Sequence, residues 1–350
     1  MSFAAAPEYA VFPTRSEPLK PYEAALRAAN ETRPLISEFD PDMVVSDILT
    51  LAPGLAAELE GRPWATLIPH LLPTSEPGHA PYSVGARLPR TRAGDALWRS
   101  LAPLVARGEL QGRDELNETR RRLGLPLLAH THGGISRQLA LVATFPQLEY
   151  PRGGWAPAVR VTGPLLWEQP YGDVELPPGD EPLVLLAPST SQDPGGRMVA
   201  AALEGLAREP VRVIATMNAR APVDSRGLPP NVRLVDWLSY AKTMPRCDVV
   251  VCHAGHGTVA RALTCGVPIV ACPVAGDMAE NASRVAWAGA GVSLPRRLTT
   301  ARGVKLAVRK VLGDATYGEQ AARLHQWLDT HDAGKTASVA IETLASKPCD

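Results

Sequence analysis

A short glycine-rich turn carries the clearest chemical signal in this sequence. Residues 248–253 form an apolar run typical of a buried parallel strand, and the turn at residues 255–258, which reads GHGT, follows almost at once. Thr258 is predicted to cap a helix that ends at Gly266. Glycine lets the backbone approach an anion closely, and a helix N-terminus offers unpaired N–H groups with a positive dipole end. The turn therefore predicts a site for a diphosphate.

Strand and helix patterns alternate along the second half of the chain and would hold this turn in place. The predicted strands cover residues 183–188, 211–217, 232–237, 248–253, 269–273 and 291–294. The predicted helices cover residues 197–208, 240–244, 259–265, 279–288, 301–312, 320–329 and 335–344. This alternation predicts an α/β fold with a doubly wound parallel sheet, whose ligands bind at the carboxyl ends of the strands.

The first half predicts a second parallel sheet covered by helices. Its expected strands lie at residues 9–13, 43–48, 65–69, 139–145 and 158–162, and its helices at residues 22–39, 55–59, 94–107 and 112–124. An acidic run rich in Pro and Gly at residues 166–182 predicts a linker between a domain at 1–165 and one at 183–350. The long irregular loop at residues 73–94 is expected to be a functional loop or a lid.

Composition excludes several classes of function. The chain has 350 residues, is 45% hydrophobic and has a formal net charge of +0, so no basic field favours nucleic acid. No apolar run reaches the length of a membrane span and no signal peptide is evident, which predicts a cytoplasmic protein. The cysteines lack a C-x-x-C pair and are expected to be thiols rather than disulfides or metal ligands; they are Cys247, Cys252, Cys265, Cys272 and Cys349.

Residues 232–294 carry the string H-x-G-x-G-T…GVP…P…D…N-A, which resembles the donor-binding half of family 1 glycosyltransferases of the GT-B fold. This group transfers sugars from UDP or dTDP to natural products. The resemblance implies two Rossmann-like domains with a cleft between them, the first incomplete at its N-terminus. It also implies a nucleotide-sugar co-substrate, no further cofactor, and a small hydrophobic acceptor such as a polyketide or macrolide.

The resemblance assigns donor contacts to ten residues of this chain. It puts Trp237 near the nucleotide base and Asp277 on the hydroxyls of the donor sugar, supported by Asn281. The diphosphate would be held by Ser189, Thr190, His253, Gly255, His256, Gly257 and Thr258. Of these, Ser189 and Thr190 are a hydroxyl pair after the first strand of this half, where Pro188 replaces the family's usual glycine.

Three of these residues also have structural interpretations. Trp237 can be a core aromatic, and His253 can be a strand-end imidazole whose hydrogen bonds the protein satisfies. Asp277 and Glu280 form the D-x-x-E pattern of a capping box at the start of the next helix.

Sugar transfer needs a deprotonated acceptor hydroxyl on one face of the anomeric carbon and a stabilised diphosphate on the other. A helix dipole, backbone N–H groups and His253 can perform the second task without a metal, so the sequence predicts metal-independent, inverting, in-line displacement. Two departures put the donor's identity in question. Arg261 replaces an acid that grips ribose hydroxyls in the family, and Met278 replaces a usual Gln.

The catalytic base is not evident from the resemblance. Relatives begin with a strand and a G-H-x-x-P loop whose His is the base, and this sequence begins later, although Asp47 matches the acid that orients that His. Three explanations stay open: a truncated start, no catalysis at all, or a base from elsewhere in the first half, namely His70, His79, His130 or His132.

Other classes of protein fit parts of the sequence. Residues 255–260 match the G-x-G-x-x-A fingerprint of an NAD-dependent oxidoreductase, but three strands precede that unit in its domain, which favours the transferase. Arg261, Met278 and the missing His fit a degenerate, non-catalytic binding partner. His132-Gly133-Gly134 resembles a lipase motif, yet no G-x-S-x-G elbow is present.

Overall fold

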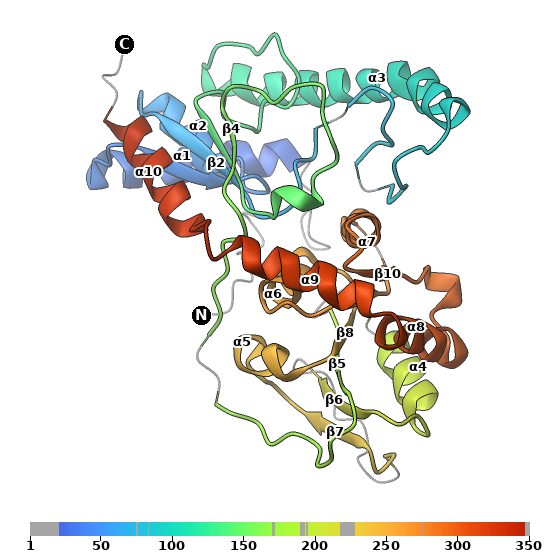
Figure 1. The fold of residues 1–350 in the computed structure, drawn as a ribbon. Helices are drawn as coiled ribbons and strands as arrows, with labels where there is room; N and C mark the ends of the chain where they lie inside the picture. Colours follow the sequence, from blue (N-terminus) through green and yellow to red (C-terminus); the bar gives the residue numbers. More distant parts are fainter. Residues whose placement is uncertain are drawn as a thin grey trace.

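The protein is described by a computed structural model that covers residues 21–74, 76–82, 84–169, 172–189, 193, 195–217, 228–274 and 276–346. These residues form two parallel β-sheets, one in each half of the chain, and helices cover both (Figure 1). The α/β class predicted from the alternating patterns is therefore confirmed. The strand predicted at residues 9–13 lies outside the described residues.

The first sheet has the strand order β1-β2-β3-β4 and all of its pairings are parallel. Its strands are β1 (Val44–Asp47), β2 (Trp64–Ile68), β3 (Leu139–Val142) and β4 (Val159–Val161), and its helices are α1 (Pro21–Phe39), which precedes β1, α2 (Ala52–Leu59) and α3 (Arg92–Leu123). Parallel neighbours require crossovers; α2 supplies the one from β1 to β2, and α3 the one from β2 to β3. All strands therefore point their carboxyl ends toward one edge of the sheet.

Helix α3 corrects one prediction, because it joins the two helices expected at residues 94–107 and 112–124 into one of 32 residues. Thr91 caps its start by accepting a hydrogen bond from the N–H of Gly94, and Gly124, with φ of 73°, ends it. The interior glycines Gly108 and Gly112 were read as a break. A glycine inside a helix costs only about 1 kcal/mol, which the rest of a long helix outweighs.

The second sheet has the order β10-β9-β8-β5-β6-β7, again with parallel pairings. Its strands are β5 (Leu183–Ala187), β6 (Arg212–Thr216), β7 (Val232–Val235), β8 (Val249–Cys252), β9 (Ile269–Ala271) and β10 (Gly291–Ser293). The chain builds outward from β5 to β7 and then returns to the other side of β5 with β8. Loops after β5 and β8 diverge at this switch point, where open α/β sheets bind ligands.

Helices cover both faces of this sheet, as predicted, and their ends differ from the predictions by a few residues. They are α4 (Arg197–Leu206), α5 (Tyr240–Thr243), α6 (His256–Thr264), α7 (Met278–Trp287), α8 (Ala301–Gly313) and α9 (Ala315–Trp327). The observed strands end one or two residues before the predicted ends, because the last predicted residues leave the sheet and form the loops at its carboxyl edge.

The last helix, α10 (Ala333–Ala345), leaves the second sheet and packs on the first (Figure 1). Its buried residues Ala337 and Leu344 lie in one hydrophobic cluster with Ala65 of β2 and Leu141 of β3. Residues 183–350 are thus not one spatial unit, and the predicted linker at 166–182 stays a prediction.

The thiols agree with the sequence analysis. Cys252 and Cys272 are buried, Cys247 and Cys265 are half-buried, and all four are free, whereas Cys349 lies outside the described residues. Within the ranges given above, no helix is long and apolar enough to cross a membrane.

Candidate active site

The predicted phosphate turn lies at the end of β8 and begins α6. Ala254 has a positive φ of 63° that turns the chain, Gly255 is the N-cap residue, and the helix starts at His256. Thr258 is therefore inside the first turn and does not cap the helix, so that prediction is wrong. The earliest helical hydrogen bond joins the N–H of Val259 to the carbonyl of Gly255. The N–H groups before it belong to the helix end that attracts anions.

Both ring nitrogens of His253 form hydrogen bonds within the protein. Its Nδ1 accepts from the N–H of Ser189 at 2.8 Å, which leaves the proton on Nε2, and Nε2 donates to Asp193 at 3.1 Å. Burial acts to raise the pKa of Asp193, but hydrogen bonds from the N–H groups of Met198 and Arg197 and the nearby His253 lower it. His253 thereby ties the loop after β5 to the end of β8, and its role toward phosphate stays a prediction.

A cavity of about 350 Å³ opens between the ends of β5 and β8. Trp237 borders it and is 42% exposed, which excludes the interpretation of this residue as a core aromatic. Thr190 lies outside the described residues. The structure gathers seven predicted donor-site residues around the cavity, with five others; the full lining is Ser189, Trp237, His253, Gly255, His256, Gly257, Thr258, Glu168, Ala187, Pro188, Leu238 and Tyr240.

Glu168, from the irregular segment between the sheets, is a cavity residue that the sequence analysis missed. Its carboxylate accepts from the N–H groups of Tyr240 and Ala241 and lies 3.3 Å from the hydroxyl of Ser239. It therefore fixes the loop that carries Trp237. The sequence gives no signal for this contact, because the two segments are more than 70 residues apart.

Asp277 and Asn281 lie together at the start of α7, as the resemblance implies. The Asn281 amide donates to the carboxylate of Asp277 at 3.0 Å and to the carbonyl of Ala254 at 2.9 Å, which joins α7 to the phosphate turn. The capping box is absent: Asp277 already has helical φ and ψ and its side chain caps nothing. Its expected partner Glu280 is buried and pairs instead with Arg284 at 2.7 Å.

Two buried acceptors remain unsatisfied beside this group. The Nε2 of His256 donates to the carbonyl of Ala143 in the first half, and burial lowers the pKa of His256 to about 4, so the ring is neutral at pH 7. Its Nδ1 is then an acceptor. That atom and Oδ1 of Asn281 have no hydrogen-bond partner among the described residues. Both atoms are buried, so the carboxylate of half-buried Asp277 is the acceptor of this group that a ligand can reach.

The two substituted family positions do not line the cavity. Arg261 is half-buried on α6 and does not line the cavity, and Met278 is 7% exposed at the start of α7.

The residues that the sequence offered as the catalytic base, or as the acid that orients it, lie in different places in the first half. Asp47 ends β1 and accepts from the N–H of Leu49 at 2.8 Å, and no described histidine contacts it. His130 and His132 precede β3, toward the amino edge of the sheet, where His132 lies 3.4 Å from Glu109. His79 packs against the edge of Tyr150. His70 follows β2 and is the candidate that emerges at the carboxyl edge.

Known proteins match most of the chain. Residues 200–334 match the family described as "Erythromycin biosynthesis protein CIII-like, C-terminal domain". The chain is 31% identical over 326 residues to 4'-demethylrebeccamycin synthase of Lentzea aerocolonigenes, covering 89% of this chain and 75% of that protein. It is 30% identical over 310 residues to the PGL/p-HBAD biosynthesis rhamnosyltransferase of Mycobacterium bovis (strain BCG / Pasteur 1173P2), of whose length it spans only 64%, with 83% of this chain covered.

Solved structures share the fold. The glycotransferase of kitacinnamycin superposes with a TM-score of 0.71 at 21% identity, covering 94% of this chain and 82% of that one. Spinosyn rhamnosyltransferase SpnG, complexed with thymidine diphosphate, superposes with a TM-score of 0.61 at 19% identity, covering 91% and 79%. By its sequence and its two-sheet architecture, the chain belongs to the family 1 natural-product glycosyltransferases of the GT-B fold.

Proposed function

We propose that this chain transfers a sugar from a nucleotide diphosphate sugar to a hydroxyl of a small, hydrophobic acceptor, with inversion at the anomeric carbon. The observation that carries the proposal is the cavity at the switch point of the second sheet. It combines a half-exposed Trp237 with the N-terminus of α6. A nucleobase can stack on the indole while the helix N-terminus neutralises a diphosphate.

The donor sugar would lie beside Asp277. Sugars present hydroxyl donors, and the carboxylate of Asp277, held by the amide of Asn281, accepts hydrogen bonds. Asn281 also bonds the phosphate turn through Ala254, so one side chain links the sugar wall to the diphosphate site. This arrangement supports a sugar diphosphate more than a nicotinamide dinucleotide.

The transfer would not need a metal, because the end of α6 supplies positive potential to the leaving diphosphate. The chain has an Asp-x-Asp pair at Asp40 and Asp42, which could suggest a metal site. That pair precedes β1 at the amino edge of the first sheet, and Asp40 pairs there with Arg62. Loss of transfer in EDTA that a divalent ion restores would contradict a metal-independent reaction.

We propose dTDP rather than UDP as the nucleotide. The thymidine diphosphate complex of SpnG supports this choice.

Calorimetric titration of dTDP, UDP and NAD tests the donor site, with dTDP expected to bind tightest. Incubation with dTDP-α-D-glucose and 2-chloro-4-nitrophenol, followed by NMR of the product, tests the transfer. A β-glucoside confirms inversion. Binding of NAD alone would favour an oxidoreductase, and binding of dTDP without transfer to any acceptor would favour a non-catalytic binding protein.

A further inference from the structure

His70 lies where the first half of the molecule faces the proposed diphosphate site. The pairing of Ile68 with Val142 places the residues after β2 beside those after β3. One of the latter, Ala143, accepts the hydrogen bond from His256 in the phosphate turn. His70 therefore lies across the domain interface from the turn that would hold the leaving group.

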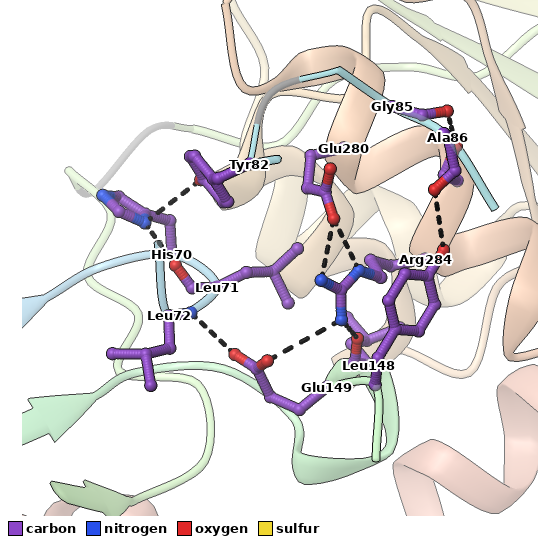
Figure 2. Close-up of polar contacts among 12 residues, drawn as sticks. His70, Leu71, Leu72, Tyr82, Gly85, Ala86, Leu148, Glu149, Glu280 and Arg284 are labelled. Carbon is purple, nitrogen blue, oxygen red and sulfur yellow. Dashed lines mark hydrogen bonds and ion pairs between the residues drawn. The ribbon is translucent and has the colours of Figure 1, made fainter. Parts of the chain in front are cut away.

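The contacts of His70 fix which nitrogen can act as a base. Its Nδ1 lies 2.7 Å from the carbonyl of Leu71, an acceptor only, so Nδ1 must carry the proton. The hydroxyl of Tyr82 lies 3.3 Å from the same nitrogen. The lone pair is then on Nε2, and Figure 2 shows that edge of the ring pointing away from both partners. A histidine held this way can accept a proton, and the cation that forms keeps its hydrogen bond to Leu71.

One unsatisfied polar atom lies at the same interface. The hydroxyl of Thr144, next to Ala143, is fully buried and has no hydrogen-bond partner among the described residues. Buried polar atoms are rarely left unpaired unless a ligand or water satisfies them.

A chain of buried contacts joins the backbone beside His70 to the second half (Figure 2). The N–H of Leu72 donates to Glu149 at 2.7 Å, and the same carboxylate lies 3.7 Å from the guanidinium of Arg284 on α7. Arg284 also donates to the carbonyl of Leu148 at 3.1 Å. The backbone that orients His70 is thus fastened to the helix that begins with Asp277.

We infer that His70 is the general base of the transfer and that Glu149 and Arg284 position it. The inference rests on the proposed function. Nε2 of His70 takes the proton of the acceptor hydroxyl as its oxygen bonds to the anomeric carbon. The bond from that carbon to the diphosphate oxygen breaks, and its electron pair leaves with the dTDP.

The test compares His70→Gln with His79→Gln, a partly buried histidine of the same half, using dTDP-α-D-glucose and two acceptors. With benzyl alcohol, which must lose a proton, kcat of His70→Gln should fall by about 10²-fold or more. With 2-chloro-4-nitrophenol, which is ionised at neutral pH, it should fall by less than about tenfold, because no proton remains to be removed. His79→Gln should transfer to both acceptors like the unchanged chain.

Calorimetric titration of dTDP distinguishes a wrong assignment of His70 from a wrong proposed function. His70→Gln should bind dTDP with an unchanged Kd, since the base does not touch the nucleotide. Equal losses with both acceptors, or wild-type rates with both, would overturn the assignment of His70 and leave the proposed function standing. An unchanged chain that binds dTDP but transfers glucose to neither acceptor would overturn the proposed function, and this inference with it.

Discussion

The guanidinium carbon of Arg284 lies 3.4 Å from the centre of the Tyr150 ring, and the two residues come from different halves of the chain. Arg284 is 5% exposed and also pairs with Glu280 and Glu149. Nearby, the hydroxyl of Ser283 donates to the carbonyl of Gly85, so the loop that follows β2 is fastened to α7 as well. The halves therefore share a buried ionic and aromatic contact rather than only a hinge.

Replacing Arg284 should destabilise the fold strongly. Arg284→Met leaves Glu280 buried without its cation and removes one of the two cations beside Glu149, and breaking a buried pair in this way typically costs about 3–5 kcal/mol. Arg99→Met is the matched control, because Arg99 is 59% exposed and pairs with Asp95, 42% exposed, where loss of a pair costs about 1 kcal/mol or less. Urea unfolding measures both. Equal losses in the two variants would contradict an organising role for Arg284.

The stability that Glu149 contributes should depend on pH. Burial raises the pKa of Glu149 above its ordinary 4.5, against the lowering effects of the Leu72 N–H and of Arg152 and Arg284. A raised pKa means that the folded state prefers the protonated form. Relative to Glu149→Gln, the free energy of unfolding of the unchanged chain should therefore fall as the pH rises from about 4.5 through the folded pKa. Urea titrations between pH 4 and pH 7 measure the difference, and a difference that stays constant contradicts the prediction.

A substitution at Gly257 should weaken ligand binding without weakening the fold. A methyl group there would meet no protein atom within 4 Å, and the residue lies in a helix, where alanine is favoured over glycine by about 1 kcal/mol. Gly257→Ala should keep or raise the melting temperature yet weaken dTDP binding, because the methyl group occupies the space where the diphosphate approaches the N–H groups.

Gly108→Ala provides the control for this variant. Gly108 is also helical, in α3, and a methyl group there likewise meets nothing within 4 Å. It should stabilise the protein to a similar extent and leave the Kd for dTDP unchanged. If Gly257→Ala binds dTDP as tightly as Gly108→Ala does, the diphosphate lies elsewhere.

Trp237 should contribute binding energy and little stability. Loss of a base-stacking aromatic typically costs about 1–3 kcal/mol, so Trp237→Leu should weaken dTDP binding by about tenfold or more. Because the side chain is 42% exposed, the melting temperature should change little. Trp167, which is 76% exposed and absent from the cavity lining, is the control, and Trp167→Leu should bind dTDP normally. An unchanged affinity of Trp237→Leu for dTDP would contradict a role for Trp237 in stacking on the base.

Local patterns in the sequence were sufficient to predict the main architecture. Buried parallel strands are continuous apolar runs, and the six predicted in the second half all form, from β5 to β10. The turn before α6 was also found, since glycine and a following helix leave a local signature. The start of that helix was misplaced, because the positive φ of Ala254 turns the chain earlier than a Thr cap at Thr258 requires.

The residues that sequence analysis missed act through partners far away in the chain. Asp193, Glu168 and Arg284 carry no local pattern, and the contacts that explain them, with His253, Tyr240 and Leu148, span 60, 72 and 136 residues. The expected capping box failed because of a competing contact. Glu280 has the right spacing to bond the start of α7, yet the buried guanidinium of Arg284 competes for its carboxylate and prevails.

The return of α10 to the first sheet decides how this chain can be recombined with its relatives. A donor half excised at residue 183 and carried through to the end would take α10 away from Ala65 and Leu141, leaving an apolar face of the recipient sheet bare. The same graft would bring an unmatched amphipathic helix into the new host. A chimera that exchanges residues 183–332 leaves α10 on its own sheet, and is the unit that we expect to carry donor specificity.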